Sequence, residues 1–177
     1  LLAGRATLPG PNTVAVDDKQ YRAGKILIAT GGWPHIPDFP GKELAVTSNE
    51  IFDLERFPER LVVVGGGYIA VEFAGIFNGL GARVTQLYRG PLFLRGFDAD
   101  IREHAAQEIA KSGVDLRFET NVTAITASAG GLQLQLTDGS VIEADAVLYA
   151  TGRKPNLAGL GLEIVSVELN ENGTIAV

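Results

Sequence analysis

The chain has 177 residues, of which 46% are hydrophobic and 20% are charged, and its formal net charge is −6. This composition is typical of a globular protein and excludes a disordered chain or a collagen-like repeat. The acidic balance argues against nucleic acid or an anionic membrane as the main partner, because both attract Lys and Arg.

The absence of cysteine removes several classes of chemistry. Without Cys the chain can hold no disulfide, thiolate nucleophile, dithiol redox centre or Cys metal site. His35 and His104 are the only histidines, so we expect no metal site. We find neither the roughly 20 apolar residues that a membrane span needs nor a signal peptide, and expect a soluble, cytoplasmic protein. Because the chain has no Met, even at position 1, we expect it to be a fragment.

The first predicted elements lie within residues 13–30. They are a strand, a turn at Asp17-Asp18-Lys19, and a second strand that ends with the apolar run Ile26–Ala29. Residues 33–43 are rich in proline, which suits neither a helix nor a central strand, and we interpret them as a linker.

A strand, a glycine turn, a helix and a second strand follow. Leu61–Val64 is a continuous apolar run of the kind found in a parallel strand buried on both faces. Gly65-Gly66-Gly67 comes next, and apolar residues from Tyr68 to Leu80 recur on one helical stripe that Gly81 ends. With a strand over Arg83–Tyr88, this order predicts a βαβ unit.

A second helix and a series of short strands complete the pattern. Asp100 and Glu103 have the spacing of a capping box and predict a helix that runs to Gly113. Apolar and polar residues alternate over residues 115–149, which we interpret as a run of short antiparallel strands that ends with Ala146–Tyr149.

The chain also contains an internal repeat. The sequence Ala-Thr-Gly occurs twice, at residues 29–31 and 150–152. Each copy follows an apolar run and is followed, at the same distance, by a proline. Only the second copy is preceded by a glycine turn. We therefore expect the chain to begin inside one nucleotide-binding domain, to cross a second complete one, and to stop shortly after leaving it.

The predicted fold class is α/β. We expect a Rossmann-like, three-layer dinucleotide-binding domain with an antiparallel β-meander, together with part of a second, FAD-binding domain. The predicted divisions are residues 1–43 for the end of the FAD-binding domain and the linker, 44–152 for the NADPH-binding domain, and 153–177 for the return.

The candidate binding site is the motif Gly65-x-Gly67-x-x-Ala70. Gly65 allows a tight turn, Gly67 lets the backbone approach a pyrophosphate, and Ala70 lets helix and strand pack closely. Unpaired amides and the positive end of the helix dipole then face the anion. The alternative is a turn that glycine merely makes possible.

Coenzyme preference is expected to depend on the end of the second strand. An NAD site carries a carboxylate there, whereas this chain has Tyr88, followed by Arg89 and then by Arg95. Two guanidinium groups beside a ribose suit a 2′-phosphate, so we expect a preference for NADPH. The alternative is that both arginines are solvated surface residues.

Two further residues of the first helix have open roles. Glu72 stands next to Val71 and Phe73, where we expect a core-facing position, and a buried carboxylate needs a partner. We interpret Glu72 as pairing with a segment outside the chain or contacting a cofactor, in preference to simple exposure. Tyr68 either caps the core or covers the ligand site.

These motifs together resemble the flavin-dependent pyridine nucleotide-disulfide oxidoreductases, and within them the glutathione reductases. The resemblance rests on Val64–Gly75, on Tyr88-Arg89 with Leu94–Asp98, on the two Ala-Thr-Gly stretches and on Gly152–Asn156. It covers essentially the whole chain.

The resemblance implies a set of binding residues and no catalytic residue in the chain. It implies that Tyr68 covers the nicotinamide pocket, and that Glu72 pairs with a lysine of the disulfide-bearing helix, which lies outside these residues. The implied nucleotide contacts are Gly65, Gly66, Gly67, Ile69, Ala70 and Glu72, with Arg89 and Arg95 on the 2′-phosphate, Gly152 near the cofactor, and Ala6, Thr30 and Gly31 on the FAD side.

The resemblance also implies the activity of the complete protein. In such enzymes NADPH reduces FAD, FAD reduces a redox disulfide, and the dithiol reduces oxidised glutathione. The complete enzyme is expected to be a homodimer, whereas the fragment alone is expected to be inactive. The alternatives are a related enzyme such as a trypanothione reductase, or a stand-alone nucleotide-binding module without catalysis.

Overall fold

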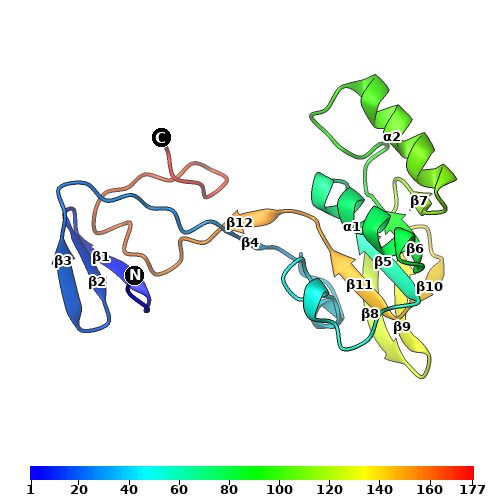
Figure 1. Cartoon of the computed structure of the whole chain (residues 1–177), viewed down its shortest axis with the longest axis horizontal. Coiled ribbons are helices and arrows are strands. Elements are labelled where there is room, and N and C mark those ends of the chain that lie inside the picture. The colour runs from blue at the N-terminus through cyan, green and yellow to red at the C-terminus, as the bar shows by residue number, and fades with distance from the viewer. The chain divides into compact units, whose positions relative to one another are not determined.

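The computed structural model describes all of residues 1–177 and divides them into two compact units. Unit 2 is the continuous segment Pro34–Gly152, whereas unit 1 combines Leu1–Trp33 with Arg153–Val177 (Figure 1). The chain thus leaves unit 1, forms the whole of unit 2 and returns to unit 1. None of its helices has the length and apolar character needed to cross a bilayer.

The two ends of unit 2 are hydrogen-bonded to each other. The N–H of His35 donates to the carbonyl of Gly152 at 3.0 Å, and the hydroxyl of Thr151 donates to the carbonyl of His35 at 2.9 Å. Entry and exit of this unit therefore lie side by side. The segment expected to be a linker is packed here, since the ring of Phe39 stacks on that of Tyr149 with centroids 5.2 Å apart.

The centre of unit 2 is a parallel sheet with the strand order β11-β5-β6-β7. Its strands are β5 (Arg60–Val64), β6 (Arg83–Leu87), β7 (Asp115–Arg117) and β11 (Ala146–Tyr149). Helix α1 (Tyr68–Gly79) joins β5 to β6, and Gly81 follows it with φ +99°. That left-handed conformation ends the helix. The predicted βαβ unit is confirmed.

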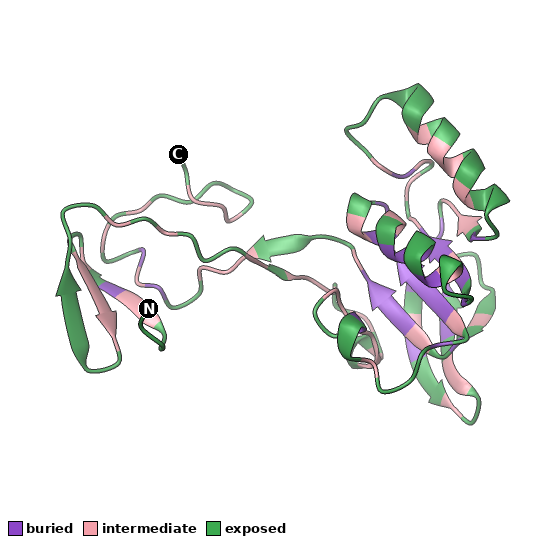
Figure 2. Ribbon diagram, in the orientation of Figure 1, coloured by how far each residue is buried: buried purple, intermediate pink, exposed green.

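Both faces of the parallel sheet are covered, which explains the continuous apolar run in β5. Leu61 and Val63 pack against α1, whereas Val62 and Val64 pack against the antiparallel sheet β10-β9-β8. Figure 2 shows the buried residues concentrated in the parallel strands and on the inner face of α1. The antiparallel strands are β8 (Val122–Ser128), β9 (Gly131–Leu136) and β10 (Val141–Ala144). The predicted three-layer α/β fold is confirmed.

The expectation of one antiparallel run over residues 115–149 is wrong at both ends. Strand β7 pairs in parallel with β6, and β11 pairs in parallel with β5. Alternation identifies a strand but not its neighbour. A strand that follows a helical crossover, as β7 follows α2, runs in the same direction as the strand before that crossover.

The start of α2 (Ala99–Lys111) also differs from the prediction. Asp98, and not Asp100, is the N-cap, because its carboxylate accepts a hydrogen bond from the Asp100 N–H at 3.0 Å. The expected capping box with Glu103 is therefore wrong. Two short 3-10 helices, η1 (Lys42–Leu44) and η2 (Ile51–Asp53), precede β5.

Unit 1 contains a three-stranded antiparallel sheet and a two-stranded one. The strands are β1 (Ala6–Gly10), β2 (Thr13–Val16) and β3 (Lys19–Arg22), with β4 (Gly32–Pro34) paired to β12 (Arg153–Pro155). The strand expected over Ile26–Ala29 does not form. Ile26 and Ile28 pack beside Leu8, but Leu27 is 89% exposed, and the segment is paired with no strand.

Candidate functional site

The glycine turn between β5 and α1 requires glycine at its first position. Gly65 has φ +147°, and a Cβ atom there would overlap the carbonyl oxygen of Ala150 and lie 3.2 Å from the Cβ of Ala70. Ala150, which directly follows β11, is held at this place because its N–H donates to the carbonyl of Val64 at 2.8 Å. The turn therefore combines a special backbone conformation with close packing on two sides.

Two amides of the turn lack an acceptor. The carbonyl of Gly66 accepts a hydrogen bond from the N–H of Leu94 at 2.6 Å, whereas the N–H groups of Gly66 and Gly67 make no hydrogen bond in the structure. Gly67 is the N-cap residue of α1, and no side chain caps the helix. Unpaired amides and the positive end of a helix dipole at one place form a site for an anion.

Tyr88 closes the side of the turn next to β6. Its ring lies so near Gly66 that a Cβ atom there would overlap it, and a Cβ atom at Gly90 would lie 2.8 Å from its Cε1. The ring is thus held between two glycines at the carboxyl end of β6. A tyrosine in this place offers no carboxylate to a ribose hydroxyl.

The residues just before Arg89 and Arg95 in the sequence both contact Gly66. Arg89 follows Tyr88, whose ring packs on Gly66, and Arg95 follows Leu94, whose N–H binds its carbonyl. Both arginines are exposed, and the structure gives neither of them a carboxylate partner. Two arginines without a carboxylate partner therefore lie next in sequence to residues that contact the turn.

The loop that carries these arginines is held from two directions. Phe93 is fully buried, and its ring contacts that of Phe118 edge-on at 5.6 Å. From α2, the guanidinium of Arg102 donates to the carbonyl of Leu92 at 2.5 Å and to that of Phe93 at 2.7 Å. The position of Arg95 is thus fixed by its neighbours rather than by an ion pair of its own.

The expectation of a buried carboxylate at Glu72 is wrong. The buried face of α1 consists of Ala70, Phe73, Ala74 and Phe77, whereas Glu72 is exposed and makes no hydrogen bond or ion pair in the structure. Helix neighbours in sequence point in different directions, so adjacency to Phe73 did not place Glu72 in the core.

Tyr68, at the first position of the same helix, is 60% exposed. Of the two roles left open for it, capping the core is therefore wrong. Ile69, the next residue, is partly buried against the α1 side of the core.

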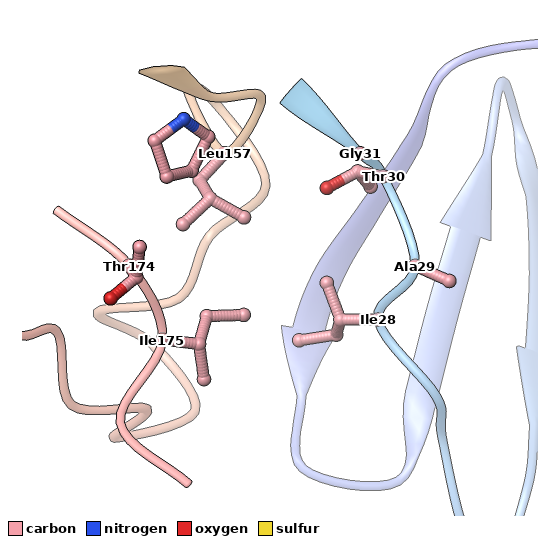
Figure 3. Close-up of a pocket in the computed structure, with 8 residues that line it drawn as sticks. Ile28, Ala29, Thr30, Gly31, Leu157, Thr174 and Ile175 are labelled. Carbon is pink, nitrogen blue, oxygen red and sulfur yellow. The ribbon is translucent and has the colours of Figure 1, made fainter. Parts of the chain in front are cut away.

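The remaining predicted site residues lie in two places. Gly152 is exposed and follows β11 at the same edge of the parallel sheet as the glycine turn. In unit 1, Thr30 and Gly31 line a hollow of about 180 Å³, opposite Leu157, Thr174 and Ile175 (Figure 3). The structure does not bring Ala6 to this hollow, since it is paired with Val16 in the sheet of β1 and β2.

No group of three His, Asp or Glu side chains is arranged to hold a metal ion. Beneath the turn, burial raises the pKa of the Tyr149 hydroxyl well above its ordinary value, so this hydroxyl stays neutral. Its ring serves as a packing partner of Phe39. We assign no catalytic residue to the chain.

Sequence reasoning missed several residues that shape the turn. Gln86 in β6 is 1% exposed, and its Nε2 donates to the carbonyl of Gly65 at 3.1 Å. The contacts of Leu94 and Ala150 with the turn also come from distant parts of the chain. The sequence gives no clear signal for Gln86, because Arg83 and Thr85 of the same strand are polar as well.

The family model described as pyridine nucleotide-disulphide oxidoreductase matches residues 1–177. The chain belongs to this family. Among its relatives is the glutathione reductase of Burkholderia cepacia, 52% identical over 177 residues, which are 100% of this chain and 39% of that protein. The trypanothione reductase of Leishmania donovani is 44% identical over 173 residues, which are 96% of this chain and 34% of that protein.

Solved structures agree with this membership. The flavoprotein disulfide reductase RclA of Escherichia coli superposes with a TM-score of 0.91 at 31% identity, over 98% of this chain and 41% of that one. An engineered water-forming NADPH oxidase, bound to NADPH, has a TM-score of 0.79 at 28% identity, over 95% of this chain and 40% of that one. The chain thus spans well under half the length of the relatives that it matches.

Proposed function

We propose that the chain supplies the NADPH-binding part of a flavoprotein disulfide reductase that acts on oxidised glutathione. The observation that carries the proposal is that Tyr88 and Leu94, the residues just before the unpaired Arg89 and Arg95, both contact the glycine turn whose Gly66 and Gly67 amides have no acceptor. In this arrangement the amides bind the pyrophosphate and the arginines bind the 2′-phosphate that distinguishes NADPH from NADH.

One structural relative supports this coenzyme preference. The engineered NADPH oxidase carries an aspartate replaced by alanine, the next residue replaced by arginine, and a second arginine introduced further along. Those two arginines have the same spacing as Arg89 and Arg95, and the alanine has the same relation to them as Tyr88. A missing carboxylate and two added cations accompany NADPH in that protein.

The relatives support oxidised glutathione as the proposed substrate. Glutathione reductases of a bacterium, a cyanobacterium and a plant are 44% to 52% identical to this chain. Since the chain has no cysteine, the redox disulfide of the proposed enzyme lies in residues outside it. A trypanothione reductase is the second candidate, because one relative of that name is also 44% identical. The proposed enzyme is a cytoplasmic homodimer.

The chain's own residues have the following roles in this proposal. Bound NADPH supplies a hydride to FAD. Gly66, Gly67 and Ile69 at the start of α1 hold the coenzyme, and Tyr68, exposed at the same place, covers its nicotinamide end. Glu72 faces outward from α1, free to pair with a group outside the chain. Thr30 and Gly31 line the hollow on the FAD side.

The decisive experiment compares the two nicotinamide coenzymes. Binding of NADPH and NADH is measured by calorimetry for the wild type and for the double variant Arg89→Gln, Arg95→Gln. Each charge-assisted contact contributes roughly 1.5–3 kcal/mol, so we expect the variant to lose at least about a hundredfold in NADPH affinity and little in NADH affinity.

Arg83→Gln is the matched control, because Arg83 is exposed at the opposite end of β6. Equal loss of both coenzymes, or no loss, would remove Arg89 and Arg95 from the phosphate site. In the full-length protein, bound FAD and NADPH-dependent reduction of oxidised glutathione test the activity, and trypanothione disulfide tests the second candidate.

A further inference from the structure

Gln86 is out of place in the strand that carries it. Only two polar side chains of the chain are buried, Gln86 and Thr120, and Gln86 is 1% exposed. Val84, two residues earlier on the same face of β6, is part of the apolar core beneath α1. An apolar residue at position 86 would continue that face.

The amide of Gln86 is only half satisfied. Its Nε2 donates to the carbonyl of Gly65 at 3.1 Å, whereas its Oε1 is buried and has no partner. A buried acceptor without a donor opposes folding. The contact with Gly65 therefore needs a reason other than the stability of the core.

The contact fixes the orientation of a peptide group in the turn. The chain has no cis peptide bond, and in a trans peptide the C=O and the next N–H point in opposite directions. By holding the Gly65 carbonyl inside the protein, Gln86 turns the Gly66 N–H away from the interior. Leu94 does the same one residue later, since its hold on the Gly66 carbonyl directs the Gly67 N–H.

Both amides so directed are the ones without an acceptor. Glycine peptides rotate more freely than others, so a turn of three glycines keeps these N–H groups in fixed directions only if its carbonyls are held. From this geometry we propose that Gln86 is a positioning residue, which orients the Gly66 N–H toward the pyrophosphate of the coenzyme. The inference rests on the proposed function, because it assumes that a dinucleotide binds at this turn.

The test separates a positioning role from a structural one. Gln86→Met keeps the length of the side chain but removes both polar atoms. Dissociation constants are measured with the full chain for NADPH and for adenosine 2′-monophosphate, which carries the adenosine and the 2′-phosphate but no pyrophosphate. We expect roughly a tenfold weaker affinity for NADPH and an unchanged affinity for the monophosphate.

Thermal unfolding provides the second readout. Gln86→Met removes an unpaired buried acceptor together with one hydrogen bond, so its melting temperature should stay close to that of the wild type. Val84→Ala, the control on the same face of β6, should melt at a lower temperature and bind both ligands as the wild type does.

Two kinds of result separate a failure of the proposed function from a failure of the positioning role of Gln86. If wild-type protein does not bind NADPH, the proposed function fails. If wild-type protein binds NADPH and Gln86→Met binds it equally well, or if the variant weakens both ligands alike, the positioning role is overturned while the proposed function stands.

Discussion

The N–H of Leu94 donates to the carbonyl of Gly66 at 2.6 Å, across a gap of many residues in the sequence. This bond ties the loop that carries Arg95 to the turn that carries the unpaired amides. Under the proposed function, this bond joins a cation for the 2′-phosphate and N–H donors for the pyrophosphate in one connected piece of backbone. The same piece includes Tyr88, whose ring fills the space over Gly66.

Because Gly66 and Tyr88 are in contact, we expect substitutions at the two positions to have non-additive effects on the free energy of unfolding. Gly66→Ala places a methyl group where the ring lies, so we expect it to destabilise the chain by about 1–3 kcal/mol. Tyr88→Ala removes the ring and should relieve most of this clash in the double variant. Chemical denaturation of the four proteins measures the coupling energy. Additive losses would mean that ring and glycine do not touch.

Arg102 is expected to affect coenzyme binding without touching the coenzyme. Arg102→Met removes the hydrogen bonds to the carbonyls of Leu92 and Phe93, which hold the loop in place. We expect NADPH affinity to fall several-fold because Arg95 loses its fixed position, with a smaller effect on NADH. Calorimetric titration checks this, and Lys111→Met on the same helix is the control. An unchanged ratio of the two affinities contradicts it.

Two glycines of the βαβ unit should respond in opposite directions to alanine. Gly65→Ala combines a left-handed φ of +147° with overlap on the Ala150 carbonyl, so we expect a loss of more than about 3 kcal/mol in the free energy of unfolding. Gly75→Ala lies on the exposed side of α1, with no atom within 4 Å of the new Cβ, and should add about 0.5–1 kcal/mol. Urea denaturation measures both.

The N-cap of α2 gives a direct test of the corrected helix start. Asp98→Ala removes the acceptor of the Asp100 N–H and should cost about 0.5–2 kcal/mol. Glu103→Ala should cost almost nothing, because Glu103 makes no capping bond. If thermal unfolding ranks the two variants in the reverse order, Asp98 is not the cap.

Acid stability is expected to depend on Asp145. Hydrogen bonds from Arg60 hold the pKa of this carboxyl below its ordinary value, despite the opposing effect of desolvation. A carboxyl whose pKa is lower in the folded state stabilises the fold above its unfolded pKa of about 3.9, and this contribution is lost as pH falls through the folded pKa. Asp145→Asn should therefore melt below the wild type at pH 7, and the difference should shrink at pH 3.

Much of the fold could be predicted because its signals are local. The apolar run of β5, the glycines that follow it and the stripe on α1 are adjacent in sequence and specify a βαβ unit. Strand partners are not local. The sequences of β7 and β11 predict strands correctly but do not reveal that both join the parallel sheet, and the apolar run at Ile26–Ala29 forms no strand.

In the candidate site, too, local features could be predicted from the sequence and contacts between distant residues could not. The glycine turn and the two arginines could be predicted from their spacing in the sequence, since one helix and one strand of typical length lie between the turn and the arginines. The contacts that hold the turn could not be predicted, because Gln86, Leu94 and Ala150 reach it from other strands and loops. The orientation of Glu72 could not be predicted from its neighbour Phe73, because adjacent residues of a helix point in different directions.

The hydrogen bonds between His35 and the Thr151-Gly152 pair hold the first and last residues of unit 2 next to each other. A segment whose first and last residues meet can be excised, closed with a short linker or grafted into a loop of another scaffold without stretching its backbone. Unit 2 is therefore suited to transfer into a related protein as one piece, and such a transfer would carry with it the coenzyme preference proposed for this segment.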